Sequence, residues 1–182
     1  KGETLIDTAR NLEAMKPDVI VLRHPSSGAP HLIAKRVKCS VINAGDGIHA
    51  HPSQALLDMM SVRQKKGDIK GLKVSIIGDI SHSRVARSDI QGFSKMGADV
   101  HVCAPQTMIP MGIEDLGCRV AKDMESCVEG ADVIMMLRIQ KERQGNILFP
   151  TEREYATLFG LNRRRLELAK PDAIVMHPGP MN

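Results

Sequence analysis

A histidine and a glutamine stand three residues apart at the start of a predicted helix. The segment reads His51-Pro52-Ser53-Gln54 and is followed by an apolar run over residues 55–57. Because proline suits the first position of a helix, we expect His51 to be the N-cap and Gln54 to lie in the first turn. Two neutral hydrogen-bonding side chains then stand beside the free N–H groups of a helix. This arrangement suits an anionic ligand and a polarised carbonyl group, although plain capping is at least as common for so short a pattern.

Other polar residues take equivalent positions elsewhere in the chain. Each group lies just past the carboxyl end of a predicted strand, where open α/β sheets bind their ligands. The groups are Arg23, His51 with Gln54, Arg84, Arg138 with Gln140, and His177-Pro178-Gly179-Pro180. If these ends face one crevice, three arginines converge there and favour a ligand with several carboxylate or phosphate groups. Such a crevice supports group transfer between anionic substrates, driven by positioning and by stabilisation of a developing oxyanion.

Apolar runs of strand length alternate with helical patterns along the chain. The predicted strands span residues 19–22, 40–42, 73–77, 99–103, 133–137 and 173–176. The predicted helices span residues 4–15, 28–35, 52–64, 84–95, 124–129 and 162–168. This alternation is typical of α/β proteins with parallel sheets, and we predict that class.

The chain of 182 residues is long enough for one domain or for two small ones. The one plausible boundary is the polar, glycine-containing segment 64–68, directly after the helix that begins near His51. We therefore predict a smaller first unit over residues 1–66 and a second αβ unit over residues 67–182.

Composition argues against several other classes of protein. With no Trp, one Tyr, three Phe and a net charge of +4 spread along the chain, nucleic-acid binding is not expected. We expect neither a membrane span nor a signal peptide, and the four cysteines form no C-x-x-C pair, which favours a cytoplasmic location.

His49 and His51 form only a weak metal motif, and the loop at Gly78 lacks the further glycines of a dinucleotide site. We therefore predict neither a metal nor a cofactor.

Five short motifs occur in a characteristic order along the chain. They are Arg23-His24-Pro25, Gly45-Asp46-Gly47, His51-Pro52-Ser53-Gln54, the R-I-Q-K-E-R segment 138–143 and His177-Pro178-Gly179-Pro180. Together they resemble the catalytic chains of aspartate carbamoyltransferases, along essentially the whole sequence. The resemblance implies an enzyme, a transferase that condenses carbamoyl phosphate with L-aspartate to give N-carbamoyl-L-aspartate and phosphate in pyrimidine biosynthesis. It also implies a homotrimer with active sites shared between neighbouring subunits, and it leaves open whether regulatory or dihydroorotase chains attach.

For carbamoyl phosphate, the resemblance implies five binding residues. Arg23 would hold a phosphate oxygen and, with His51, the carbonyl oxygen, so these two are the expected catalytic residues. Gln54 would hold the carbamoyl amide, and backbone carbonyl groups of the turn at Gly179 and Pro180 would orient its NH2 group. The aspartate amine would attack the carbonyl carbon, and the departing phosphate would take the proton, so no dedicated protein base is needed.

For aspartate, the resemblance implies two arginine clamps and two further residues. Arg84 and Arg138 would hold the two carboxylates, with Gln140 beside them. Lys1 matches the lysine of a mobile loop that reaches into the adjacent subunit's site. Arg87 is the alternative to Arg84, and the family's spacing favours Arg84.

Two segments favour aspartate over ornithine as the acceptor. Ornithine carbamoyltransferases share the H-P-x-Q element but typically carry S-M-G and H-C-L-P where this chain has residues 137–140 and 177–180. An arginine that faces the acceptor would repel the ammonium group of ornithine. The alternative functions are a non-catalytic carbamoyltransferase-like subunit and transfer to another amino acid such as ornithine.

The resemblance also predicts that the chain is a fragment. The family's S-T-R-T phosphate loop has no equivalent here, and the chain stops at Asn182, before the family's C-terminal helices. The expected fold is two lobes, each a parallel sheet with flanking helices, of which the first is incomplete. We accordingly expect the isolated chain to bind carbamoyl phosphate poorly or to be inactive.

Overall fold

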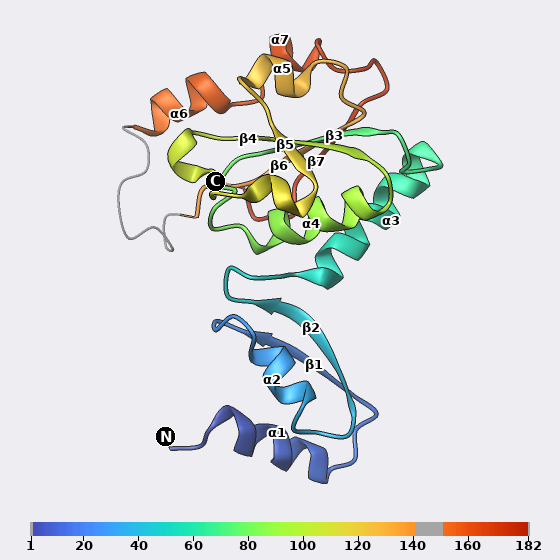
Figure 1. Ribbon diagram of the computed structural model, residues 1–182, viewed down its shortest axis with the longest axis vertical. Coiled ribbons are helices and arrows are strands. Elements are labelled where there is room, and N and C mark those ends of the chain that lie inside the picture. Colours follow the sequence, from blue (N-terminus) through green and yellow to red (C-terminus); the bar gives the residue numbers. More distant parts are fainter. Residues whose placement is uncertain (1, 141–150, 182) are drawn as a thin grey trace.

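The computed structural model describes residues 2–140 and 151–181, and within them the strands form two separate sheets (Figure 1). One sheet pairs β1 (Val19–His24) with β2 (Ser40–Asp46) in parallel. The strands of the other sheet are β3 (Lys73–Ile77), β4 (Asp99–Cys103), β5 (Cys118–Val120), β6 (Val133–Met136) and β7 (Ile174–Met176). Their order is β5-β4-β3-β6-β7, and every pair is parallel. The predicted α/β class with parallel sheets is confirmed.

Helices and short 3-10 turns connect the strands. They are α1 (Leu5–Ala14), α2 (Ala29–Ala34), α3 (Pro52–Lys66), α4 (Arg84–Lys95), η1 (Gln106–Met108), η2 (Ile113–Leu116), α5 (Met124–Val128), α6 (Glu152–Phe159) and α7 (Arg163–Leu166). Capping side chains fix where several of them begin. The hydroxyl of Thr4 accepts from the Asp7 backbone N–H at 3.2 Å, and Ser83 does the same for Ala86 at 3.1 Å. Each cap satisfies an N–H group that the helix itself leaves without a partner.

The five-strand sheet is covered on both faces (Figure 1). Alternate residues of β3 point to opposite sides, so that Val74 and Ile76 join the core beneath α3 and α4 while Ile77 joins the core beneath α5. The largest of the buried side chains beneath α3 and α4 is Phe93. Strands buried on both faces are expected to be continuously apolar, and β3 and β6 are so apart from Lys73 and Ser75.

The two-strand sheet has a much smaller core. Ile33 of α2 is buried against it, whereas Val19, Val21 and Ile42 are exposed. Figure 1 shows this sheet with α1 and α2 at the end of the molecule opposite α5 and α7, and α3 leads from it to the larger sheet.

Most differences from the predicted elements concern their ends. β1 continues to His24, so Arg23 lies inside the last part of the strand rather than after it, and β2 continues to Asp46 rather than ending at residue 42. The strand β5, the helix α6 and both 3-10 turns were not predicted. The division of the chain after residue 66 stays a prediction, although α3 does end at Lys66 before Gly67, whose φ is 84°.

Candidate active site

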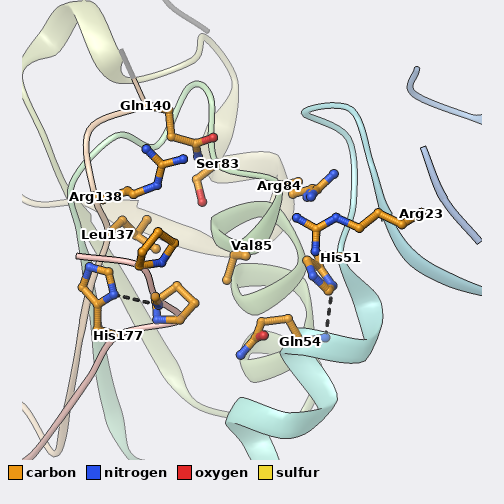
Figure 2. Close-up of a pocket in the computed structure, with 13 residues that line it drawn as sticks. Arg23, His51, Gln54, Ser83, Arg84, Val85, Leu137, Arg138, Gln140 and His177 are labelled. Carbon is orange, nitrogen blue, oxygen red and sulfur yellow. Dashed lines mark hydrogen bonds between the residues drawn. The ribbon is translucent and has the colours of Figure 1, made fainter. Parts of the chain in front are cut away.

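A cavity of about 180 Å³ lies where the carboxyl ends of the strands meet the first turns of α3 and α4 (Figure 2). Every predicted site residue within the described part of the chain borders it. These residues are Arg23, His51, Gln54, Arg84, Arg138, Gln140, Gly179 and Pro180. Figure 2 shows Arg23 reaching toward His51 and Arg84, with Arg138 and His177 on the opposite side. Lys1 lies outside the described residues, and the individual roles of all nine stay predictions.

His51 caps α3, as predicted. Its Nδ1 accepts from the backbone N–H of Gln54 at 3.3 Å, which leaves the proton of a neutral ring on Nε2 as a donor. Burial lowers the pKa of His51 below its ordinary value of 6.5, and the guanidinium groups of Arg84 and Arg23 lower it further. At neutral pH the ring is therefore an uncharged hydrogen-bond donor. His49, by contrast, has its Nδ1 3.0 Å from Asp46 Oδ2 and most of its side chain exposed.

Arg84 is the first residue of α4 and is only 6% exposed. Its Nη1 donates to the carbonyl oxygen of Gly47 at 3.4 Å. A Cβ atom on Gly45 would lie 2.8 Å from Arg84 Cζ, and Gly45 has a φ of 115°. The backbone angle favours glycine, and a Cβ atom would have to displace the guanidinium group, so Gly45 leaves room for Arg84 between the two sheets. Arg87, the alternative clamp, does not border the cavity.

Asp79 joins two loops of the site. It is fully buried, its Oδ1 accepts from the His82 backbone N–H at 3.2 Å, and its Oδ2 accepts from the Gln140 backbone N–H at 3.1 Å. The loop before α4 is thereby tied to the segment after β6 that carries Arg138. Asp46 fixes another loop in the same way, since its Oδ2 accepts from the Gly28 backbone N–H at 2.6 Å.

The segment after β7 closes the cavity with a tight turn. His177 Nδ1 accepts from the Gly179 backbone N–H at 2.8 Å, and Gly179 has a φ of 66°. Burial lowers the pKa of His177, and the nearby charge of Arg138 lowers it further. His177 is therefore a second neutral ring with a proton on Nε2.

Several residues border the cavity without having been assigned to the site from the sequence. They are Ser83, Val85 and Leu137, while His177 and Pro178 were expected at this strand end but given no binding role. Two of them could have been inferred from the sequence, because Ser83 directly precedes Arg84 and Leu137 directly precedes Arg138. Val85 carries no chemical signal, because only the folding of α4 turns it toward the cavity.

Within residues 2–140 and 151–181, no group of three or more His, Cys, Asp or Glu side chains is arranged to hold a metal ion. In the same residues, no helix combines the length and apolar character needed to cross a membrane. The four cysteines are free thiols, three of them buried.

Family models match both halves of the chain. Residues 1–64 match "Aspartate/ornithine carbamoyltransferase, carbamoyl-P binding domain", and residues 70–182 match "Aspartate/ornithine carbamoyltransferase, Asp/Orn binding domain". The chain belongs to the aspartate/ornithine carbamoyltransferase family. The resemblance inferred from the five motifs is thereby confirmed at the level of the family.

Curated relatives of this family align with the whole chain. The aspartate carbamoyltransferase catalytic subunit of Desulforapulum autotrophicum is 80% identical over 182 residues, and that of Geobacter sulfurreducens is 66% identical over 183 residues. The alignments cover 100% of this chain but 58% and 59% of those relatives. The chain thus spans less than two thirds of their length.

Solved structures of the family have the same fold. Aspartate transcarbamoylase from Trypanosoma cruzi, in complex with aspartate and phosphate, has a TM-score of 0.81 at 30% identity, with 100% of this chain and 58% of that chain covered. Ornithine carbamoyltransferase from Gloeobacter violaceus has a TM-score of 0.80 at 25% identity, with 99% and 62% covered. Since both acceptor types share the fold, the choice of acceptor has to be argued from the side chains of the cavity.

Proposed function

We propose that this protein transfers the carbamoyl group of carbamoyl phosphate to the amine of L-aspartate, giving N-carbamoyl-L-aspartate and phosphate in pyrimidine biosynthesis. One observation carries the proposal: three guanidinium groups border the cavity, and none of the described residues that border it is Asp or Glu. Such a site favours substrates with several negative charges and offers no counter-ion to an ammonium side chain. The volume of about 180 Å³ suits small metabolites, since pockets for drug-sized ligands measure roughly 300–1,000 Å³.

In the proposed reaction, the carbamoyl half of the site stabilises charge that develops on the carbonyl oxygen. Arg23 binds a phosphate oxygen and, with the Nε2 proton of His51, the carbonyl oxygen as it becomes an oxyanion. Gln54 and the backbone carbonyl groups at Gly179 and Pro180 hold the carbamoyl NH2 group. The neutral state of His51 supports this role, because a neutral donor stabilises the oxyanion without repelling the two arginines beside it.

The aspartate half of the site positions the nucleophile. Arg84 and Arg138 bind the two carboxylates, Gln140 lies beside them, and Lys1 of a neighbouring subunit completes the site in our proposal. The amine then attacks the carbonyl carbon, the C–O bond to phosphate breaks, and the departing phosphate takes the proton. Holding both substrates in one orientation supplies most of the rate acceleration in a reaction of this kind.

The proposal extends to organisation and location. We propose a carbamoyl-phosphate-binding unit over residues 1–66 and an aspartate-binding unit over residues 67–182, assembled as a homotrimer in the cytoplasm. The two separate sheets and the two family matches, over residues 1–64 and 70–182, support this division.

The test is an assay of the intact protein with radiolabelled carbamoyl phosphate and either L-aspartate or L-ornithine. We expect labelled carbamoyl aspartate and no citrulline. Citrulline as the main product would overturn the acceptor assignment. Binding of both substrates without any product would support the alternative of a non-catalytic subunit.

A further inference from the structure

Two buried carboxyl groups lie behind the cavity without bordering it. Asp58, one turn after Gln54 on α3, is 4% exposed, and Asp89 on α4 is fully buried. Among the described residues, no N–H or hydroxyl group donates to either oxygen of Asp89 or to Oδ2 of Asp58, so the two carboxyl groups have only each other. An ionised carboxylate without donors is strongly disfavoured in such surroundings, so this pair of acids needs a physical explanation.

The two carboxyl groups act on each other across the contact between α3 and α4. Burial raises the pKa of Asp89 well above its ordinary value, and the charge of Asp58 and a hydrogen bond between the two carboxyl groups raise it further. Burial also raises the pKa of Asp58, against a hydrogen bond from Gln54 that lowers it. Among the described residues, no lysine, arginine or histidine shifts either pKa, so no cation neutralises the pair. Two adjacent buried carboxyl groups of this kind retain at least one proton between them.

One member of the pair holds a residue of the site. Gln54 Nε2 donates to Asp58 Oδ1 at 3.1 Å. With the amide nitrogen turned toward Asp58, the amide oxygen is the atom that Gln54 can offer to a ligand. If the amide rotated by half a turn, the nitrogen would meet the ligand and the oxygen would face the oxygen of Asp58. The hydrogen bond therefore decides whether Gln54 accepts or donates in the cavity.

We propose that Asp58 and Asp89 form a proton-sharing pair that orients the Gln54 amide, and that both are positioning residues for the carbamoyl group. A proton on Asp89 supplies an O–H donor for Asp58 Oδ2, which leaves Asp58 Oδ1 with the negative charge that holds Gln54 Nε2. The Gln54 oxygen is thereby set to accept from the carbamoyl NH2 group. The inference rests on the proposed function, because the carbamoyl group is the ligand that it assigns to Gln54.

Two substitutions at Asp89 separate a donor role from a packing role. Asp89→Asn keeps a donor at the position, whereas Asp89→Leu keeps the branched side-chain skeleton, is bulkier by its two methyl groups and has no donor. We expect Asp89→Asn to keep kcat and the KM for carbamoyl phosphate within about two-fold of the unchanged protein. Asp89→Leu should raise the KM for carbamoyl phosphate about ten-fold while the KM for aspartate changes little. Equal kinetics for the two variants, with both folded by circular dichroism, would overturn the inference.

A double-mutant cycle tests whether Asp58 acts through Gln54. Asp58→Ala, which removes the acceptor of Gln54 Nε2, should alone lower kcat/KM for carbamoyl phosphate about ten-fold, and in a Gln54→Ala background it should add almost nothing. Additive losses would show that Asp58 acts independently, which contradicts the proposal.

Infrared spectroscopy tests the shared proton without any turnover. The carbonyl-stretch band of a protonated carboxylic acid should be present in the intact protein near neutral pH, absent in Asp89→Asn, and unchanged in the exposed control Asp115→Asn. Its absence from the intact protein would overturn the pairing even if carbamoyl aspartate is formed. Conversely, a protein that shows the band but forms no carbamoyl aspartate retains the pair and loses the proposed function.

Discussion

The two sheets bring the same kinds of residue to the cavity from very different settings. The two-strand sheet supplies Arg23, but its buried apolar core is small and one of its valines, Val21, is 65% exposed. The five-strand sheet supplies Arg84 and Arg138 from a scaffold packed on both faces. The comparison teaches that the larger sheet can position its guanidinium groups by its own packing, whereas the smaller one depends on contacts with its neighbour. Two such contacts are visible, Gly47 with Arg84 and the His51 backbone N–H with Ser88 Oγ at 2.9 Å.

The strongest test of this comparison removes the guanidinium group on which both regions converge. Arg84→Ala should lower kcat/KM for aspartate by on the order of 10²–10⁴, since loss of one partner of a desolvated charge pair costs about 3–5 kcal/mol. Steady-state kinetics with carbamoyl phosphate saturating would measure it. Arg87→Ala is the matched control, because Arg87 is three residues away on the same helix and does not border the cavity. Similar losses in the two variants would refute the assignment of Arg84.

One side-chain truncation in the core of each sheet tests the difference in packing between the two sheets. Ile76→Ala and Ile33→Ala each remove a buried side chain, and each should cost about 2–5 kcal/mol. We expect Ile76→Ala to reduce amide hydrogen-exchange protection in both sheets, because the smaller sheet relies on the larger. Ile33→Ala should reduce protection in β1 and β2 and leave β3 and β6 as they were. A uniform loss of protection in both variants would mean that the two regions unfold as one unit.

Much of the larger sheet could be predicted because its strands are apolar runs with helical patterns between them. β5 escaped prediction because a strand of three residues, one of them Arg119, has no periodicity to read. α6 has no buried residue and is only eight residues long, so its apolar positions extend over about two turns, too few to mark a helix by periodicity alone.

The candidate site was predictable for a different reason. An arginine that follows a buried strand lies close to the core, where desolvation of its charge costs free energy. Arg84 and Arg138 therefore stand out in the sequence as candidates for a functional role. Asp58 and Asp89 could not be found in that way. They lie on different helices, and only the packing of α3 against α4 makes them a pair.

A smaller effect is expected where the two regions touch. Gly45→Ala would place a Cβ atom 2.8 Å from Arg84 Cζ at a φ of 115°, which costs about 1–3 kcal/mol in strain and displaces the guanidinium group. We expect roughly a ten-fold rise in the KM for aspartate with a modest loss of thermal stability. Gly28→Ala is the control, because Gly28 also has a positive φ but nothing lies within 4 Å of its added Cβ. A KM increase in the control alone would contradict the proposed contact.

The smallest expected effect is a pH dependence at His51, which connects the two regions. Because burial and two guanidinium groups lower its pKa below 6.5, the folded protein binds this proton less readily than the unfolded chain does. The stability that neutral His51 contributes is therefore fully present above about pH 6.5 and is lost as the pH falls through the lower, folded-state pKa. Protonation also removes the acceptor for the Gln54 N–H, a cap that contributes about 1 kcal/mol.

The corresponding measurement is kcat/KM for carbamoyl phosphate against pH. We expect a plateau above pH 6.5 and a decline below it, with an apparent pKa under that of free histidine. His177 has a pKa lowered in the same direction, so the assignment needs a comparison of variants. His177→Asn should retain the acidic decline, and His51→Asn should lose it along with much of kcat. If the decline followed His177 instead, the acid-sensitive group would belong to the larger sheet, and its assignment to His51 would have to be abandoned.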